Sequence, residues 1–321
     1  MERRGFVLGS VASVLAGCTT TPAPAPEADA PKPQLLTPAL NPGDMVVGGS
    51  QISVVFDGEP YGLPRASYEA WVRRSAQMIT DYYEGSFPVP SLEVTIVPRG
   101  RGGVGFGSHR QGRWVRVYCG RATGQRSLEN DWVMVHEMLH ATFPDLTDEH
   151  RWMQEGLSTY AEKIVRIRAG NITEENMWSR LSGSMHHGRP RAGDRGLDKT
   201  HTWGRTYWGG ALFWMVADVE LRRGTDNRKS LDDVLRHVAS IGGNARQMWE
   251  PQRVCKAADE GTGTQTVSQL YERMAKAPGD IDLDRFWADL GVIRAGDDTV
   301  EFDDTAALAH VRRGIASGRA G

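Results

Sequence analysis

The sequence has few cysteines and no excess of either charge. Three cysteines occur in 321 residues, and 38 Lys and Arg nearly balance 40 Asp and Glu, for a formal net charge of −2. A cysteine-rich disulfide scaffold is therefore excluded, and no nucleic-acid partner is expected, because nucleic-acid binders usually carry a basic excess. Beyond the N-terminus no apolar run approaches the roughly 18 residues of a transmembrane helix. The remaining composition, 40% hydrophobic and 24% charged, is that of a globular protein.

Residues 1–18 are expected to be an export segment with a lipobox. Arg3 and Arg4 precede a short apolar stretch that ends in the sequence LAGC at Cys18. The stretch is too short to span a bilayer. The LAGC sequence is similar to a bacterial lipobox, and the Arg pair resembles a twin-arginine export signal. We therefore expect Cys18 to be lipidated and to become the new N-terminus; the alternative is an ordinary signal peptide with a chance cysteine.

Lipidation would attach the chain to a membrane of the bacterial envelope. Thr19 gives no retention signal of the Asp type, which favours the outer membrane, facing the periplasm or the cell surface. Residues 19–45 are rich in Pro and Ala and are expected to form a disordered tether. Export also means an oxidising compartment. Cys119 and Cys255 suffice for one disulfide, and two buried free thiols are an equal alternative.

The rest of the chain divides into a mixed part and a helical part. In residues 46–126, apolar patterns predict one helix at 65–84 and short strands at 51–57, 92–97, 104–106 and 114–118. In residues 127–321 the pattern is helical, at 128–143, 149–169, 174–181, 205–223, 231–239, 268–275 and 305–314. We expect an α+β protein with a small N-terminal sheet lobe followed by a mainly helical catalytic lobe.

A candidate metal site begins with the sequence HEMLH at residues 136–140. Its helix is predicted to begin after Ser127, a favourable capping residue. His136 and His140 are four residues apart, so they share one helix face, about 6 Å apart, and can bind the same Zn²⁺. Glu137 is adjacent to the first histidine and can act as the general base that takes a proton from the attacking water.

A catalytic zinc site has three protein ligands and one open position. The helix predicted at 149–169 supplies Glu155 as the third ligand, so that His136, His140 and Glu155 would hold one Zn²⁺ per chain. Glu162 lies seven residues after Glu155 on the same face, where it can support a ligand or contact substrate. Other metal donors occur at Glu149, His150, His186, His187 and His201.

HExxH followed by W-x-x-E-G-x-x-x-Y at residues 152–160 resembles the gluzincin zinc metallopeptidases, which include thermolysin, aminopeptidase N and the glycyl aminopeptidases. Residues 206–212 look like the Y-x-K-G segment of these families, and residues 219–234 are similar to a region of the glycyl aminopeptidases. The likeness covers residues 54–238. It implies a thermolysin-like two-lobed fold and a zinc-dependent peptidase for peptides or unfolded proteins, with aminopeptidase slightly favoured over endopeptidase activity.

The resemblance implies that Tyr207 donates to the developing oxyanion. A packed aromatic is an equal alternative for Tyr207, and His201 competes for the role, because thermolysin-like enzymes use a histidine there. The chain departs from the families at Gly209, where they have Lys, and in residues 103–107, which lack the Glu that would hold a substrate amine. Two other hypotheses stay open: a noncatalytic metal-binding lipoprotein, and a zinc hydrolase for a nonpeptide amide or an epoxide.

Overall fold

The computed structural model describes residues 43–60 and 62–318. The predicted export segment, Cys18 and nearly all of the predicted tether lie outside these ranges. The tether prediction was too long at its C-terminal end, because strand β1 spans Asp44–Val47. Met45 pairs with Ile52 of the next strand, and both side chains are buried. Two glycines with positive φ, Gly48 and Gly49, make the tight turn between the strands.

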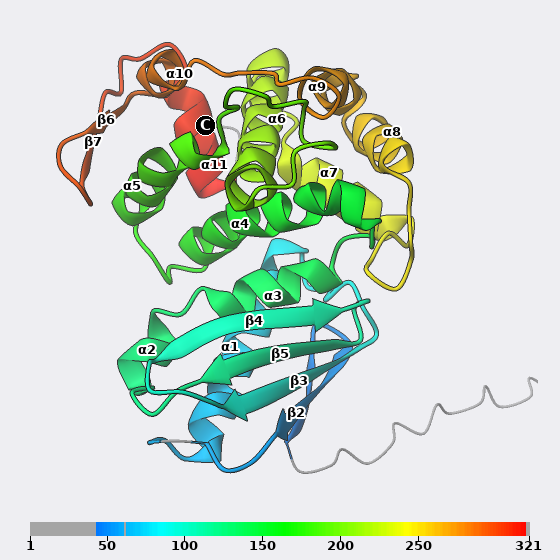
Figure 1. The fold of residues 1–321 in the computed structure, drawn as a ribbon, viewed down its shortest axis with the longest axis vertical. Helices are drawn as coiled ribbons and strands as arrows, with labels where there is room; N and C mark the ends of the chain where they lie inside the picture. Colours follow the sequence, from blue (N-terminus) through cyan, green and yellow to red (C-terminus); the bar gives the residue numbers. More distant parts are fainter. Residues whose placement is uncertain (1–42, 61, 319–321) are drawn as a thin grey trace, which may run out of the picture. The chain divides into compact units, whose positions relative to one another are not determined.

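One five-stranded sheet organises the N-terminal lobe, in the order β1-β2-β3-β5-β4 (Figure 1). The two outer pairs, β1 with β2 and β4 with β5, are antiparallel, whereas β2–β3 and β3–β5 are parallel. Strand β4 therefore forms one edge of the sheet. The strand bounds are Ser50–Phe56 for β2, Ser91–Pro98 for β3, Val104–Arg110 for β4 and Trp114–Cys119 for β5.

Helix α1, Arg65–Tyr82, packs behind the sheet and closes its core (Figure 1). Trp71 and Ile79 on α1 are buried, as are Val94 and Ile96 on β3. Burying each such side chain is worth about 1.5–3 kcal/mol. This core fixes the sheet from which β4 reaches the candidate site.

The helix predicted at 128–143 is two helices, α2 at Gln125–Glu129 and α3 at Val133–Ala141. Asp131 lies between them, and its carboxylate accepts hydrogen bonds from the backbone N–H groups of Val133 (3.0 Å) and Met134 (2.9 Å). The prediction that Ser127 caps the metal-site helix was wrong: Ser127 is inside α2. The Asp131 carboxylate binds the free N–H groups at the start of α3, so a second helix begins here in place of one long helix.

The helical lobe is built around α4 and α6, which cross near its centre (Figure 1). Its main helices match the predicted ones, whereas α8, α10 and the hairpin β6–β7 were not predicted. The bounds are Asp148–His150 for the 3-10 turn η1, Arg151–Arg168 for α4, Glu174–Ser184 for α5, Met185–Gly188 for the 3-10 turn η2, Gly204–Gly209 for the π-helical turn η3, Gly210–Thr225 for α6, Leu231–Ser240 for α7, Pro251–Thr262 for α8, Thr266–Met274 for α9, Leu283–Leu290 for α10, Val292–Arg294 for β6, Val300–Phe302 for β7 and Ala309–Ser317 for α11.

Helix α3 contacts both lobes. It packs against α1, β4 and β5 on one side and against α4 on the other. Within the described ranges, no helix is both long and apolar enough to span a membrane. The two lobes thus meet along α3 and α4, the two helices that carry the candidate metal ligands.

Cys119 and Cys255 do not form a disulfide. Cys119 ends β5 in the sheet lobe, Cys255 lies in α8 of the helical lobe, and both are buried free thiols. Burial raises the pKa of each thiol to about 12. Of the two alternatives that the sequence left open, the structure shows the free thiols.

Candidate active site

His136, His140 and Glu155 converge on one point. The three distances between His136 Nε2, His140 Nε2 and Glu155 Oε2 are all 3.3 Å, and all three residues are buried. A tetrahedral zinc ion with ligand bonds of about 2.0–2.1 Å has ligand atoms about 3.3–3.4 Å apart. The donor set and its spacing therefore fit one zinc ion bound by three protein ligands, with a fourth position for water or substrate.

The protonation states also fit a metal site. Burial and, after it, the neighbouring His109 lower the pKa of His140 to about 4, so its imidazole is neutral near pH 7. Burial favours the neutral form of Glu155, but His140 and hydrogen bonds from both histidines hold the pKa of this carboxyl well below its usual range. Neutral imidazole and ionised carboxylate are the forms that bind a metal.

Arg151 orients Glu155 from one helical turn earlier on α4. Its Nε and Nη2 atoms donate to Glu155 Oε1 at 3.1 and 2.9 Å. The other oxygen, Oε2, is the one that faces the two imidazoles. Such outer partners fix the geometry of a ligand and contribute to metal affinity.

Glu137 points from α3 towards the edge strand β4. Its Oε2 atom lies 3.2 Å from Nδ1 of His109, and the His109 ring stacks on the His140 ring with centroids 3.7 Å apart. Burial raises the pKa of Glu137, but the hydrogen bond from His109 and the neighbouring imidazoles of His140 and His136 outweigh burial and lower it below its usual value. Glu137 is therefore ionised near pH 7, as a general base must be.

His109 was not predicted as a site residue. The sequence pattern ended the strand at residue 106, whereas β4 continues to Arg110. Side chains two residues apart on a strand point to the same face, so Gly107 and His109 both face α3. A longer strand prediction would have included His109, but its place beside Glu137 depends on the packing of β4 on α3, which the local sequence does not encode.

Tyr207 lies in the π-helical turn and lines the same cleft. Its ring is 6.5 Å from the ring of His136, centroid to centroid. Burial raises the pKa of Tyr207 to about 12, and the charge of Glu155 adds to the effect, so the phenol keeps its proton and can donate it. The competitor His201 is exposed, donates from Nε2 to the carbonyl oxygen of Asp198 (2.8 Å) and does not line the cleft.

Glu162 also lines the cleft, but its charge is balanced. Lys163 Nζ lies 2.6 Å from its Oε1 atom, and Arg166 Nη1 lies 3.5 Å from Oε2. All three side chains are buried. Glu162 is therefore part of a small ion-pair cluster at one end of the cleft.

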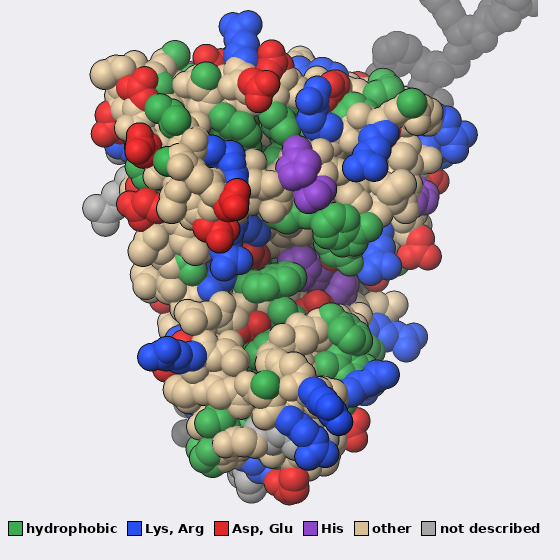
Figure 2. All heavy atoms as spheres, turned by 60° about the vertical axis from the view of Figure 1, so that its left-hand side comes forward, with side chains coloured by type: hydrophobic (Ala, Val, Ile, Leu, Met, Phe, Trp, Pro, Cys, Tyr) green, Lys and Arg blue, Asp and Glu red, His purple; other side chains and the backbone are tan. Residues whose placement is uncertain are grey.

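The cleft has a volume of about 700 Å³ and runs between the two lobes. Figure 2 shows it as a hollow in which histidine side chains lie, with hydrophobic side chains around it. Three exposed aromatic side chains line its mouth, with exposed fractions of 64% for Phe106, 45% for Trp132 and 62% for Trp203. They come from β4, from the residue before α3 and from the residue before the π-helical turn.

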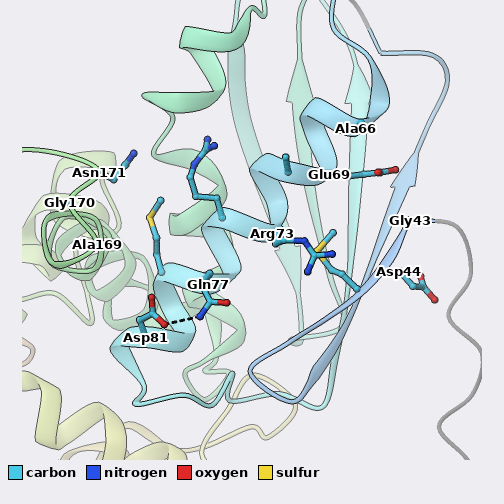
Figure 3. A pocket seen from close by; sticks show the side chains of 14 residues that line it. Gly43, Asp44, Ala66, Glu69, Arg73, Gln77, Asp81, Ala169, Gly170 and Asn171 are labelled. Atoms are coloured by element: carbon cyan, nitrogen blue, oxygen red, sulfur yellow. Dashed lines mark hydrogen bonds between the residues drawn. The ribbon is translucent and has the colours of Figure 1, made fainter.

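A second hollow, of about 820 Å³, lies along the outer side of α1 (Figure 3). Its polar lining comes from Asp44 on β1, from Asn171 after α4, and from five residues of α1, which are Glu69, Arg73, Arg74, Gln77 and Asp81. It has no histidine or cysteine in its lining. Both groups of potential metal ligands in the described residues lie in the cleft instead: His136, His140 and Glu155, and a second group of His109, Glu137 and His140. The cleft between the lobes, although smaller than the hollow along α1, is therefore the candidate active site.

Solved structures resemble this chain to different degrees. An aminopeptidase N family protein from Idiomarina loihiensis matches with a TM-score of 0.59 and 16% identity, over 82% of this chain and 52% of that one. An M1 zinc metallopeptidase from Deinococcus radiodurans matches with a TM-score of 0.47 and 16% identity, over 71% and 49%. No family model matches the chain. No curated protein matches it either.

The chain thus has a gluzincin-like fold, as the motif resemblance implied. The expected α+β class, with a small sheet lobe followed by a mostly helical lobe, is confirmed. The chain spans about half the length of the solved structures that it matches. At this identity the likeness shows the fold alone.

Proposed function

We propose that this protein is a zinc-dependent peptidase. The carrying observation is the triangle of His136, His140 and Glu155 donor atoms, 3.3 Å on each side, next to the ionised Glu137. Zinc bound there would polarise a scissile carbonyl and lower the pKa of a water molecule. A purely structural zinc site usually has four protein ligands, often cysteines, so three ligands and a cleft favour catalysis over the noncatalytic alternative.

Two side chains would transfer the proton and stabilise the negative charge of the transition state. Glu137 would take a proton from the attacking water and pass it to the leaving amine. Tyr207, protonated and facing the same cleft, would donate a hydrogen bond to the oxygen that becomes negative in the transition state. Arg151 would keep Glu155 oriented throughout.

The substrate class follows from the edge strand. An extended peptide can add to the free edge of β4 through backbone hydrogen bonds. Gly105 and Gly107 on β4 add no side-chain bulk along this strand, and Glu137 lies directly against Gly107, so a peptide backbone on β4 would lie close to the base. We therefore propose peptides or unfolded proteins as substrates, with apolar side chains next to the exposed aromatics Phe106, Trp132 and Trp203.

Whether the protein is an aminopeptidase or an endopeptidase depends on whether a carboxylate in the cleft can bind the free α-amine of a substrate. Aminopeptidase activity, slightly favoured by the resemblance, needs such a group, and β4 offers none. Glu162 is already paired with Lys163 and Arg166. This pairing supports cleavage that does not require a free N-terminus, which makes endopeptidase activity the second candidate.

We also propose that the enzyme works in the bacterial envelope, attached to the outer membrane through lipidated Cys18. The support is the LAGC sequence and the Pro- and Ala-rich segment behind it. A single acyl chain binds membranes only marginally, so stable attachment needs more than one chain. The Cys18→Ser variant should leave the membrane fraction; sedimentation of the variant with membranes would contradict lipidation at this residue.

The activity is tested with the zinc-loaded protein and a peptide library in which each peptide is present with a free and with an acetylated N-terminus. Cleavage of free peptides alone means an aminopeptidase, and equal cleavage of both means an endopeptidase. Glu137→Gln is the matched control, expected to bind zinc and to lose about 10²- to 10⁴-fold in rate. If the protein binds zinc but cleaves no peptide, the peptidase proposal fails. The noncatalytic metal-binding protein and the zinc hydrolase of a nonpeptide substrate would then be the remaining hypotheses.

A further inference from the structure

The side chain of Glu137 is in contact with strand β4 at two positions. His109 Nδ1 lies 3.2 Å from its Oε2 atom. A Cβ atom at Gly107 would be 2.3 Å from Glu137 Cγ and 2.8 Å from Oε1, so the strand backbone at Gly107 lies directly against the carboxylate. The two contacts come from neighbouring positions on one face of the strand: His109 binds one carboxylate oxygen, and the absence of a side chain at Gly107 leaves the space that the rest of the group fills.

His109 is itself held in place. Its ring stacks on His140 with an interplanar angle of 17°, and its side chain is 22% exposed. On the other edge of the strand, His109 pairs with Val115 of β5 in the sheet register. The stacking on His140 of α3 fixes the ring from one side, and the pairing of β4 with β5 fixes the backbone that carries the ring.

We propose that His109 is the positioning residue for the general base of this enzyme, and that β4 thereby serves both as the substrate-pairing strand and as the support of Glu137. This inference rests on the proposed peptidase function. It goes beyond the HExxH motif, because the motif supplies the base but not the group that orients it.

The arrangement has a consequence for the substrate. If a peptide pairs with β4, its backbone and the side chain of Glu137 are placed by the same seven-residue strand. The distance between the scissile carbonyl and the base is then fixed within one element. An orientation error at Glu137 would lower kcat, because a misplaced base acts in the transition state, and it would leave peptide binding and KM nearly unchanged.

The test compares His109→Leu, which removes the hydrogen bond, with His109→Asn, whose side-chain amide can still donate to Glu137. We expect His109→Leu to lower kcat about 10- to 100-fold, a part of what a general base contributes, with KM and zinc content unchanged. His109→Asn should recover most of the loss. His310→Leu, at a half-buried histidine on α11, is the matched control and should behave as wild type.

A double-mutant cycle separates positioning from a general structural role. In the Glu137→Gln background, His109→Leu should cause no further loss, because the group that it orients is gone. An unchanged kcat in His109→Leu, a loss of zinc, or an equal further loss in the Glu137→Gln background would each overturn the proposal.

A crystal structure of the full chain with His109→Leu gives a readout independent of activity. We expect the Glu137 carboxylate to leave its position against Gly107, whereas it should stay there in His109→Asn. If the wild-type protein cleaves no peptide, the proposed function fails, but these structures still decide whether His109 positions Glu137. An unmoved carboxylate in His109→Leu would refute the inference alone.

Discussion

Gly156 of α4 and Gly210 of α6 are in direct backbone contact. A Cβ atom at Gly156 would be 2.1 Å from the carbonyl carbon of Gly210, and a Cβ atom at Gly210 would be 2.1 Å from the carbonyl oxygen of Trp152. Glu155 precedes the first glycine, and the turn that carries Tyr207 precedes the second. The close crossing thus sets the distance between the candidate third metal ligand and the candidate oxyanion donor, which explains why Gly follows Glu155.

The first prediction concerns this crossing. Gly156→Ala should destabilise the protein by about 1–3 kcal/mol, because a methyl group there forces the two helices apart. Activity should fall as well, since Tyr207 moves away from Glu155. The measurement is denaturant unfolding together with peptidase rates.

A glycine elsewhere in α6 is the matched control for that substitution. A Cβ at Gly224 has open space around it, and its φ is not positive, so Gly224→Ala should be neutral or stabilise by up to about 1 kcal/mol. Equal effects of Gly156→Ala and Gly224→Ala would show that the crossing is not tightly packed.

The second prediction concerns the metal ligands. His140→Ala should lose most of the bound zinc, because only His136 and Glu155 remain as donors. Elemental analysis of the purified variant measures this directly. Full zinc occupancy in His140→Ala would rule out the proposed ligand set.

The third prediction concerns Arg151. Arg151→Ala should weaken zinc binding about 10- to 100-fold, the usual cost of removing a partner of a metal ligand, since Glu155 Oε1 loses both hydrogen bonds. Competition with a chelator measures the affinity. Lys256→Ala, which breaks the exposed pair with Glu260 on α8, should leave zinc affinity unchanged. The idea fails if both variants bind zinc as wild type does.

The fourth prediction is a pH effect on the metal-free protein. The pKa of His140 is lowered to about 4, so between about pH 6.5 and 4 the unfolded chain takes up a proton that the folded chain does not. His140 therefore reduces stability as the pH falls through this window. Burial raises the pKa of Asp131 to about 6, which has the opposite effect in nearly the same window.

The comparison with His140→Asn isolates the histidine. Between pH 7 and 5, wild type should lose about 1–2 kcal/mol of unfolding free energy relative to this variant. Calorimetry in the presence of a chelator gives both values. A difference that does not change with pH would mean that His140 titrates normally in the folded protein.

The fifth prediction concerns the aromatic mouth of the cleft. Trp203→Ala should raise KM for peptides with apolar side chains about 10-fold, in line with losing a large buried contact in the complex. Ile293→Ala removes a half-exposed apolar side chain on β6 that does not line the cleft, and it should leave KM unchanged. Identical KM values for wild type and Trp203→Ala would exclude this part of the rim from substrate binding.

Local sequence signals predicted the parts of the site that lie on single helices. The i, i+4 spacing placed His136 and His140 on one face, and the seven-residue spacing placed Glu162 on the face of Glu155. Helical periodicity also found α1, α4 and α6 to within a few residues. These signals work because a helix fixes side-chain directions from neighbours in the chain alone.

The parts that sequence did not predict depend on contacts between distant segments. His109 reaches Glu137 only because β4 pairs with β5 and packs on α3. Asp131 starts α3 by accepting two N–H groups, a local signal that was hidden by the equally favourable Ser127 nearby. The separation of Cys119 from Cys255 follows from the lobe architecture, which no spacing in the chain encodes.

The placement of the metal ligands on two lobes has a thermodynamic consequence. His136 and His140 come from α3, which packs on the sheet, and Glu155 comes from α4 in the helical lobe. A zinc ion bound to all three would fasten the lobes to each other, and ligand binding at about 1,000 times the dissociation constant adds about 4 kcal/mol of stability. Loss of zinc would then do more than remove the proposed activity: it would also lower the free energy of unfolding of a protein whose two lobes share one hydrophobic core.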